Sequence, residues 1–249
     1  MEHLLTGEGI MALLTLTFLE VVLGIDNIIF ISIVTNKLPA EQQPRARTVG
    51  LALALIFRVA MLLGISYIMQ FNKPLFTIPS FEFLGSVTEP FGFSGRDLIL
   101  FAGGIFLLAK STSEIYGKVE GKEHEHQVKT KSIKFSNIIF QIVMLDIVFS
   151  FDSILTAIGM TQEVLLMIIA VVISIIIMML FSGKISNFIN KHPSLQILAL
   201  SFLIMIGFML IVDAFHHHVP KGYIYAAIVF SLIVEMLNMR MRKKTVPKH

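Results

Sequence analysis

The chain has 249 residues, of which 55% are hydrophobic and only 15% are charged, and its mean hydropathy of +0.80 is far from the norm for a soluble domain. It contains no cysteine, which excludes disulfides, thiolate metal ligands and a cysteine nucleophile. The formal net charge of +3 comes from short basic stretches between apolar runs, so we expect a lipid bilayer and no nucleic acid as a partner.

Seven apolar runs follow one another along the chain. A transmembrane helix needs about 20 mostly apolar residues, and polar stretches separate runs of this kind here. In chain order, the predicted helices cover residues 10–35, 48–69, 97–116, 136–159, 162–181, 195–215 and 223–237. The sequence therefore predicts an all-α membrane protein of about seven transmembrane helices.

The basic residues lie mainly in alternate loops. Lysine and arginine gather after the first, third and fifth predicted helices and in the C-terminal tail, while the opposite loops hold few. By the positive-inside rule, this asymmetry places the N-terminus outside and the C-terminus in the cytoplasm. The longest hydrophilic stretch, 118–134, is then a cytoplasmic linker. It separates a first three-helix repeat at 1–117 from a second at 135–218, and a seventh helix with a basic cytoplasmic tail follows at 219–249.

Two segments, each in the first helix of one half, resemble each other. They are FLEVVLGIDNIIF at 18–30 and MLDIVFSFDSIL at 144–155. Because the two helices are predicted to cross the bilayer in opposite directions, the repeat is inverted, as it is in many secondary transporters. The matched pairs are Glu20 with Asp146, Gly24 with Ser150, Asp26 with Asp152, and Asn27 with Ser153.

The four acids of this repeat lie deep inside their predicted helices. A lone charge at that depth costs several kcal/mol or more, so each acid should face another polar group, a cation or a wet cavity. One interpretation is an internal ion pair, or a set of carboxyl hydrogen bonds, that locks the bundle. We favour a cation site, because four acids at a repeated spacing have too few basic partners nearby.

A small residue stands between the two acids of each segment. Six residues advance an ideal helix by about 600°, which leaves the two carboxylates about 120° apart around the axis. Unwinding at Gly24, and less strongly at Ser150, would turn both side chains inward and free backbone carbonyls as ligands. The alternative is that these small residues serve close helix packing.

The candidate ligands are all oxygen atoms. Carboxylate, amide, hydroxyl and backbone oxygens suit magnesium, calcium or manganese, while the absence of cysteine and of buried histidine disfavours zinc and copper. The candidate metal ligands are Glu20, Asp26, Asn27, Asp146, Asp152, Ser153 and Asp213. Arg58 and Lys110 lie within predicted helices, and we expect them to compensate the charge of the acids when no cation is bound. For Lys110 and Asp213, which are near helix ends, snorkelling to water is the alternative.

Four stretches resemble TerC-family membrane proteins: LEVVLGIDN, DIVFSFDSI, HPSLQILALSFLIMIG and PKGYIYAAIVFSLIVEMLN. The resemblance covers nearly the whole chain. It implies a seven-helix inverted-repeat bundle, of the superfamily that includes LysE-type amino-acid exporters, in the cytoplasmic (inner) membrane of a bacterium. It also implies export of manganese(II), with a link in some members to the metallation of secreted proteins. The family's acidic motif falls on Glu20, Asp26, Asn27, Asp146, Asp152 and Ser153, its helix 3 lysine on Lys110 and its helix 6 aspartate on Asp213.

Three functions compete at this point. The leading hypothesis is a secondary transporter that exports manganese(II) or a similar hard divalent cation as its substrate, without a cofactor. The chain has no Gly-rich, Lys-containing nucleotide loop, so ATP is not its direct energy source. The second is an intramembrane aspartyl protease with Asp26 and Asp152 as its dyad, although the flanking sequences lack the Gly-Leu-Gly-Asp type of signature. The third is a membrane interaction protein that assists protein secretion machinery or the metallation of exported proteins, without transport of its own. We expect no catalytic residue and no enzymatic activity.

Overall fold

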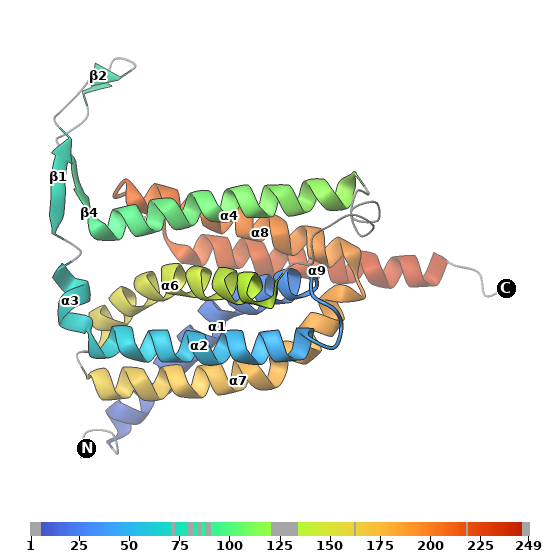
Figure 1. Ribbon diagram of the computed structural model, residues 1–249, viewed down its shortest axis with the longest axis horizontal. Coiled ribbons are helices and arrows are strands. Elements are labelled where there is room, and N and C mark those ends of the chain that lie inside the picture. Colours follow the sequence, from blue (N-terminus) through green and yellow to red (C-terminus); the bar gives the residue numbers. More distant parts are fainter. Residues whose placement is uncertain are drawn as a thin grey trace.

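The computed structural model describes residues 6–70, 73–78, 82–83, 86–87, 91–120, 134–161, 163–217 and 219–245. Seven long helices in this part of the chain run roughly along one direction (Figure 1). Their bounds are α1 Gly7–Thr35, α2 Gln43–Leu63, α4 Gly95–Val119, α6 Phe135–Met160, α7 Val164–Asn190, α8 Pro193–Ala214 and α9 Lys221–Thr245.

The helices are long and apolar enough for a membrane protein. Among the described residues, six helices meet the length and composition of a membrane span, and α6 adds an apolar stretch at Phe135–Phe151. The prediction of an all-α membrane protein with about seven helices is thereby confirmed. Several boundaries differ from the prediction: α2 begins at Gln43 instead of 48 and α9 continues to Thr245 instead of ending at 237. α2 ends at Leu63, because Gly64 caps it ahead of the short helix α3 (Ile65–Gln70). α7 continues to Asn190 instead of ending at 181, because the serines of its last turns lie on its buried face.

Short strands occupy the segment between α3 and α4, which lies between two predicted helices. The antiparallel pairs are β1 (Pro74–Ile78) with β4 (Phe91–Ser94), and β2 (Glu82–Phe83) with β3 (Ser86–Val87). Phe76 and Phe93 stack with their ring centroids 5.6 Å apart, and Phe93 also meets Phe215 after α8, at 5.9 Å. These aromatic contacts attach β1 and β4 to the adjoining helix ends.

The helices of the two halves pack against each other in a matched pattern. α1 packs mainly on α7, α4 packs on α8, and α2 packs on both α6 and α7. If α1, α2 and α4 are exchanged with α6, α7 and α8, the same pairs of packed helices result. The two halves thus correspond in their packing, and the inverted repeat stays a prediction. Gly104 of α4 and Gly207 of α8 allow backbone contact, since a Cβ on Gly104 would lie 2.6 Å from the Gly207 carbonyl oxygen.

The predicted division of the chain into two repeats and a linker can be compared with the structure only at the ends of the linker. α4 ends at Val119, close to the predicted start of the linker at 118, and α6 begins at Phe135. Residues 121–133, which make up most of the predicted linker, lie outside the described residues. The division into repeats at 1–117 and 135–218 therefore stays a prediction.

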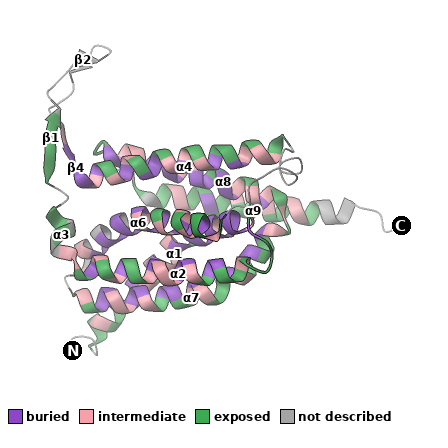
Figure 2. Ribbon diagram, viewed as in Figure 1, coloured by how far each residue is buried: buried purple, intermediate pink, exposed green. Residues whose placement is uncertain are grey.

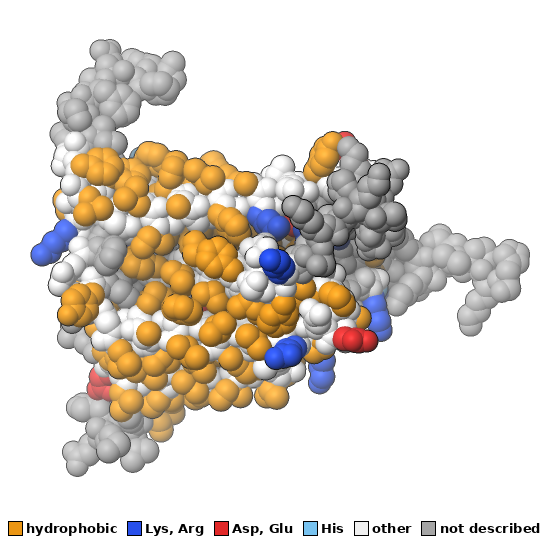
Figure 3. Space-filling model, in the orientation of Figure 1, with side chains coloured by type: hydrophobic (Ala, Val, Ile, Leu, Met, Phe, Trp, Pro, Cys, Tyr) orange, Lys and Arg blue, Asp and Glu red, His pale blue; other side chains and the backbone are white. Residues whose placement is uncertain are grey.

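The surface is apolar around the middle of the bundle and basic toward one end. Buried residues face the interior of the bundle in Figure 2, and hydrophobic side chains cover most of the face seen in Figure 3. Lys and Arg side chains gather toward the end from which the C-terminus leaves. We name this the inner end, where α1, α4, α7 and α9 finish, and its opposite the outer end. The assignment of the inner end to the cytoplasm stays a prediction.

Candidate functional site

A buried arginine joins acids from both halves of the chain in the middle of the bundle. Arg58 Nη1 of α2 donates to Glu20 Oε2 of α1 at 2.5 Å, and Arg58 Nη2 donates to Asp146 Oδ1 of α6 at 2.8 Å. The Nε of the same guanidinium lies 3.2 and 3.3 Å from the two Asp146 oxygens. Arg58, Glu20 and Asp146 are 2%, 5% and 6% exposed. Two matched acids of the repeat therefore share one positive charge, the guanidinium of Arg58.

Asp146 receives further hydrogen bonds from its neighbours. Asn27 Nδ2 of α1 donates to its Oδ1 at 3.1 Å, and Ser150 Oγ of α6 donates to its Oδ2 at 3.1 Å. Donors from three helices thus fix the orientation of this carboxylate, and hydrogen bonds to an ionised acceptor are among the stronger ones. The five residues Glu20, Asn27, Arg58, Asp146 and Ser150 are named the central network.

The amide of Asn27 has a second polar atom that the central network does not use. Its Oδ1 is buried and has no hydrogen-bond partner in the described part of the chain. The amide cannot be turned round, because its oxygen would then face the Asp146 carboxylate. A buried acceptor without a donor costs about 1–3 kcal/mol. This oxygen is therefore suited to a cation.

The charges of the central network do not cancel. Glu20 and Asp146 bring two negative charges and Arg58 brings one positive charge, which leaves one negative charge among these residues. A net charge is expensive to keep within a membrane, and a bound cation or a proton would remove it. The described side chains contain no group of three or more acids or histidines placed to hold a metal ion. A cation site here therefore needs amide or hydroxyl oxygens, or acids whose side chains are not described.

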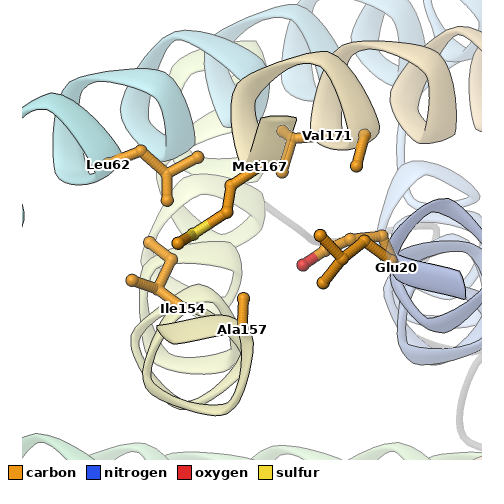
Figure 4. Close-up of a pocket in the computed structure, with 8 residues that line it drawn as sticks. Glu20, Leu62, Ile154, Ala157, Met167 and Val171 are labelled. Carbon is orange, nitrogen blue, oxygen red and sulfur yellow. The ribbon is translucent and has the colours of Figure 1, made fainter. Parts of the chain in front are cut away.

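A small cavity of about 10 Å³ lies beside Glu20 toward the outer end. This is room for about one water molecule. Figure 4 shows Glu20 extending from α1 toward side chains of α2, α6 and α7. The remaining lining residues are apolar: Leu16, Leu62, Ile154, Ala157, Met167, Ala170 and Val171. Glu20 is thus the network carboxylate that borders unfilled space, whereas donors surround Asp146.

The structure brings together four of the predicted site residues, namely Glu20, Asn27, Arg58 and Asp146. Ser153 is buried one helical turn after Ser150 in α6, and its Oγ donates to the Ser150 carbonyl at 3.3 Å. Asp26 and Asp152 lie on α1 and α6, but their side chains are outside the described part of the structure. Their assignment as ligands therefore stays a prediction.

Two further predicted residues lie toward opposite ends of the α4–α8 pair. Lys110 Nζ is 3.1 Å from Glu114 Oε1, which also pairs with Lys37 beyond the inner end of α1. Asp213 is 3% exposed in the last turn of α8, at the outer end. The ion pair with Glu114 gives Lys110 a partner apart from the central network. Its part in charge compensation, and the part of Asp213 in metal binding, stay predictions.

Both helices that carry the repeat are continuous. α1 is helical through Gly24 and α6 is helical through Ser150, so the predicted unwinding is wrong. Gly24 instead makes room for α7, because a Cβ there would collide with the sulfur of Met178. Ser150 uses its hydroxyl to bond Asp146. The small residues serve packing and hydrogen bonding, which keeps both helices regular.

Ser150 is a member of the central network that the repeat pattern does not predict as a site residue. It matches a glycine, Gly24, in the first segment. Its spacing of four residues from Asp146 is the signal that could have identified it, since residues i and i+4 share one face of a helix. Ser32 in α1 and Asn36, which caps the C-terminus of that helix, show the same spacing. They belong to a second polar cluster, which sequence analysis also missed.

The chain matches one known family along nearly its whole length. The model of the integral membrane protein TerC family matches residues 5–248. The chain belongs to the TerC family. The UPF0053 inner membrane protein YgdQ of Escherichia coli strain K12 is 48% identical over 234 residues, which are 94% of each chain. A UPF0053 protein of Haemophilus influenzae is 43% identical over 242 residues, which are 97% of this chain and 98% of the relative.

Longer relatives contain the TerC region as one part. The UPF0053 inner membrane protein YoaE of Escherichia coli strain K12 is 44% identical over 246 residues, which are 99% of this TerC-family chain and 46% of the relative. The chain thus spans about half the length of YoaE. No solved structure matches it. The names of YoaE and YgdQ place these relatives in the inner membrane, in agreement with the apolar spans of this chain.

Proposed function

We propose that this TerC-family chain is a secondary transporter that exports manganese(II), or a similar hard divalent cation, across the inner membrane of a bacterium. The observation that carries the proposal is the bridge from Arg58 to Glu20 and Asp146. It puts a protein-borne cation between matched acids of the two halves, in the interior of a membrane-spanning bundle. Transporters with inverted repeats bind their substrates at such a place, between the repeats and near the bilayer midplane.

Arg58 takes the place of the substrate cation while the site is empty. Without its guanidinium, two buried carboxylates would lack a compensating charge, which is strongly unfavourable. A divalent cation that enters would displace Arg58 and take Glu20 and Asp146 as ligands. Asn27 Oδ1 would add a neutral oxygen, and the remaining predicted oxygen ligands would complete the coordination shell. This oxygen set suits manganese, magnesium and calcium, and family membership favours manganese among them.

Arg58 also gives the empty transporter a way to return. Once the cation has left, the guanidinium pairs again with both acids, so the bundle reorients with one excess negative charge instead of two. A proton on Glu20 would neutralise that last charge, because Glu20 borders the cavity toward the outer end. Exchange of the metal ion for protons follows as the proposed coupling.

Manganese content and manganese tolerance of bacterial cells that lack their own manganese exporters test the proposal. The cells would express the wild type, Glu20→Gln or Asp146→Asn at matched membrane levels. Glu163→Gln is the control, since Glu163 is an exposed carboxylate in the turn between α6 and α7. We expect the wild type and the control to lower manganese content and both site variants to fail. Equal manganese content in all strains, with the protein present in the membrane, would contradict transport.

A second candidate is a membrane interaction protein that assists the secretion or metallation of exported proteins without transport. The same network favours it in one respect, because an ion pair across α1, α2 and α6 can lock a bundle. This candidate predicts that Glu20→Gln and Asp146→Asn leave cellular manganese unchanged, even where they weaken the fold. The manganese measurement therefore separates the two functions. We propose no enzymatic activity for the chain.

A further inference from the structure

A second polar cluster lies on α1 and α7 between the central network and the inner end. Ser32 Oγ donates to Ser186 Oγ at 2.8 Å. One turn further along both helices, Asn36 Nδ2 donates to Asn190 Oδ1 at 2.5 Å, and Asn190 Nδ2 donates back to Asn36 Oδ1 at 2.7 Å. Because the two contacts advance in the same direction on both helices, α1 and α7 run parallel here.

Arg47 of α2 joins this cluster. Its Nη1 donates to Ser186 Oγ at 3.2 Å, and the residue is 8% exposed. Buried arginines are normally paired with acids. Among the described residues, the one hydrogen-bond partner of Arg47 is this hydroxyl, so no acid compensates its charge there. The five residues Ser32, Asn36, Arg47, Ser186 and Asn190 are named the inner seam.

The inner seam continues the central network toward the inner end. Ser32 and Asn36 lie five and nine residues beyond Asn27 on α1, which is about 8 and 14 Å along the helix axis at about 1.5 Å per residue. Ser32 and Ser186 are fully buried, whereas Asn36 and Asn190 are half-buried. The polar groups of the inner seam therefore lie along α1 between the level of Asn27 and the surface of the inner end.

The cavity in the outer half of the bundle has apolar walls apart from Glu20. Leu16 of α1 and Met167, Ala170 and Val171 of α7 line the cavity beside Glu20. Apolar walls cannot replace the hydration water of a cation, because burying a charge without polar partners is very costly. The inner seam, in contrast, brings hydroxyl and amide oxygens together between α1 and α7, and such oxygens can replace hydration water.

From these contacts we propose that the inner seam is the route by which the substrate cation reaches the central network from the inner end, and that the route is closed in this structure. The inference rests on the proposed transport function. α1 and α7 part at their inner ends, and the hydroxyl and amide oxygens of the serines and asparagines then line the path. Arg47 adds a positive charge that holds back a divalent cation until the seam opens, as fixed charges do in other selective pores.

Locking the seam with paired cysteines tests the route, because the chain has no cysteine of its own. Ser32→Cys with Ser186→Cys is the first pair, since the two hydroxyls already touch and the change in size is small. Asn36→Cys with Asn190→Cys, joined by a short bifunctional thiol reagent, is the second. Manganese flux into lipid vesicles that hold the purified protein would be measured before locking, after locking and after reduction. We expect locking to lower the flux to that of protein-free vesicles, and reduction to restore it. In the four single variants, neither treatment should change the flux.

The outcomes separate this inference from the function on which it rests. A wild type that moves no manganese overturns both. Unlocked pairs that carry manganese, and carry as much when locked, overturn the route alone. If both double-cysteine variants are folded but carry no manganese before locking, a second measurement tests the route. In it, the Ser32→Cys single variant is labelled with a membrane-impermeant thiol reagent. Labelling that manganese accelerates supports the route, and absence of labelling with and without manganese overturns it.

Discussion

Arg58 of α2 and Met178 of α7 each lie against an acidic segment of the opposite half of the chain. Arg58 reaches the acidic segment of α6 at Asp146, and Met178 lies against the acidic segment of α1 at Gly24. Gly24 is the repeat match of Ser150, whose hydroxyl bonds the same Asp146. Each half thus lays one long side chain on the acidic segment of the other, but only one of the two is charged. A single guanidinium consequently serves the acids of both halves.

Arg58→Met keeps a long side chain at this place in α2 and removes its charge. We expect the metal-free variant to lose about 3–5 kcal/mol of stability, because removing one partner of a buried pair leaves the other charges uncompensated. Added manganese(II) should stabilise the variant more than the wild type, since the cation then has no guanidinium to displace. Unfolding temperatures of the detergent-solubilised protein, with and without manganese(II), measure both effects.

Arg45→Met is the matched control for this change. Arg45 is an exposed arginine in the first turn of the same helix, α2. Exposed charges contribute at most about 1 kcal/mol, so this variant should unfold near the wild-type temperature and respond to manganese(II) as the wild type does. An equal manganese response in Arg58→Met and the wild type would argue against Arg58 as the occupant of the cation position.

Asp146→Asn should cost more stability than Glu20→Gln. Asp146 accepts hydrogen bonds from Arg58, Asn27 and Ser150, while the described hydrogen bond of Glu20 comes from Arg58. Losing the charge at Asp146 weakens three contacts at once, and a broken buried pair costs about 3–5 kcal/mol. Urea or thermal unfolding of the two variants in detergent gives the comparison. A larger loss for Glu20→Gln would mean that Glu20, and not Asp146, anchors the network.

The fold could be predicted from the sequence because membrane spans depend on composition over whole segments. A run of about 20 apolar residues has few alternatives to a helix in lipid. The continued helix of α7 could not be predicted in this way, because Ser182 and Ser186 lower its hydropathy while they lie on a buried face. The unwinding expected at Gly24 was wrong for a related reason. The small residue makes room for Met178 of α7, a helix that packs on α1 but lies far from it in the sequence.

Sequence analysis selected four members of the central network, Glu20, Asn27, Arg58 and Asp146, but not Ser150. Repeat matching identified Glu20 and Asp146, and Arg58 brings these two acids together in the structure. The position of Arg58 within its helix indicated charge compensation, but only the packing of α2 on α6 shows that it bridges both acids. Arg47 and the other residues of the inner seam gave no repeated pattern, so their contacts appear only in three dimensions.

Gly104→Ala should destabilise the α4–α8 pair. A Cβ at this position would lie 2.6 Å from the Gly207 carbonyl oxygen and 2.7 Å from Ile211 Cγ1, so the two helices would have to move apart. Overpacking of this kind costs about 1–3 kcal/mol. Gly183→Ala in α7 is the control, because nothing lies within 4 Å of its Cβ position. Unfolding temperatures in detergent should fall for the first variant and hold or rise for the second, and equal temperatures would contradict backbone contact between α4 and α8.

Arg47→Gln should speed the movement of manganese(II) into the site from the inner end. The glutamine can still bond Ser186, but it removes the buried positive charge of the inner seam. Fixed charges in a low-dielectric path change the arrival of ions by about tenfold or more, so the initial rate of manganese uptake into vesicles should rise by about that factor. Arg47→Lys keeps the charge and should behave as the wild type. If instead the two variants slow uptake equally, the role of Arg47 lies in holding α2 against α7, and the barrier must be sought in the separation of α1 from α7 alone.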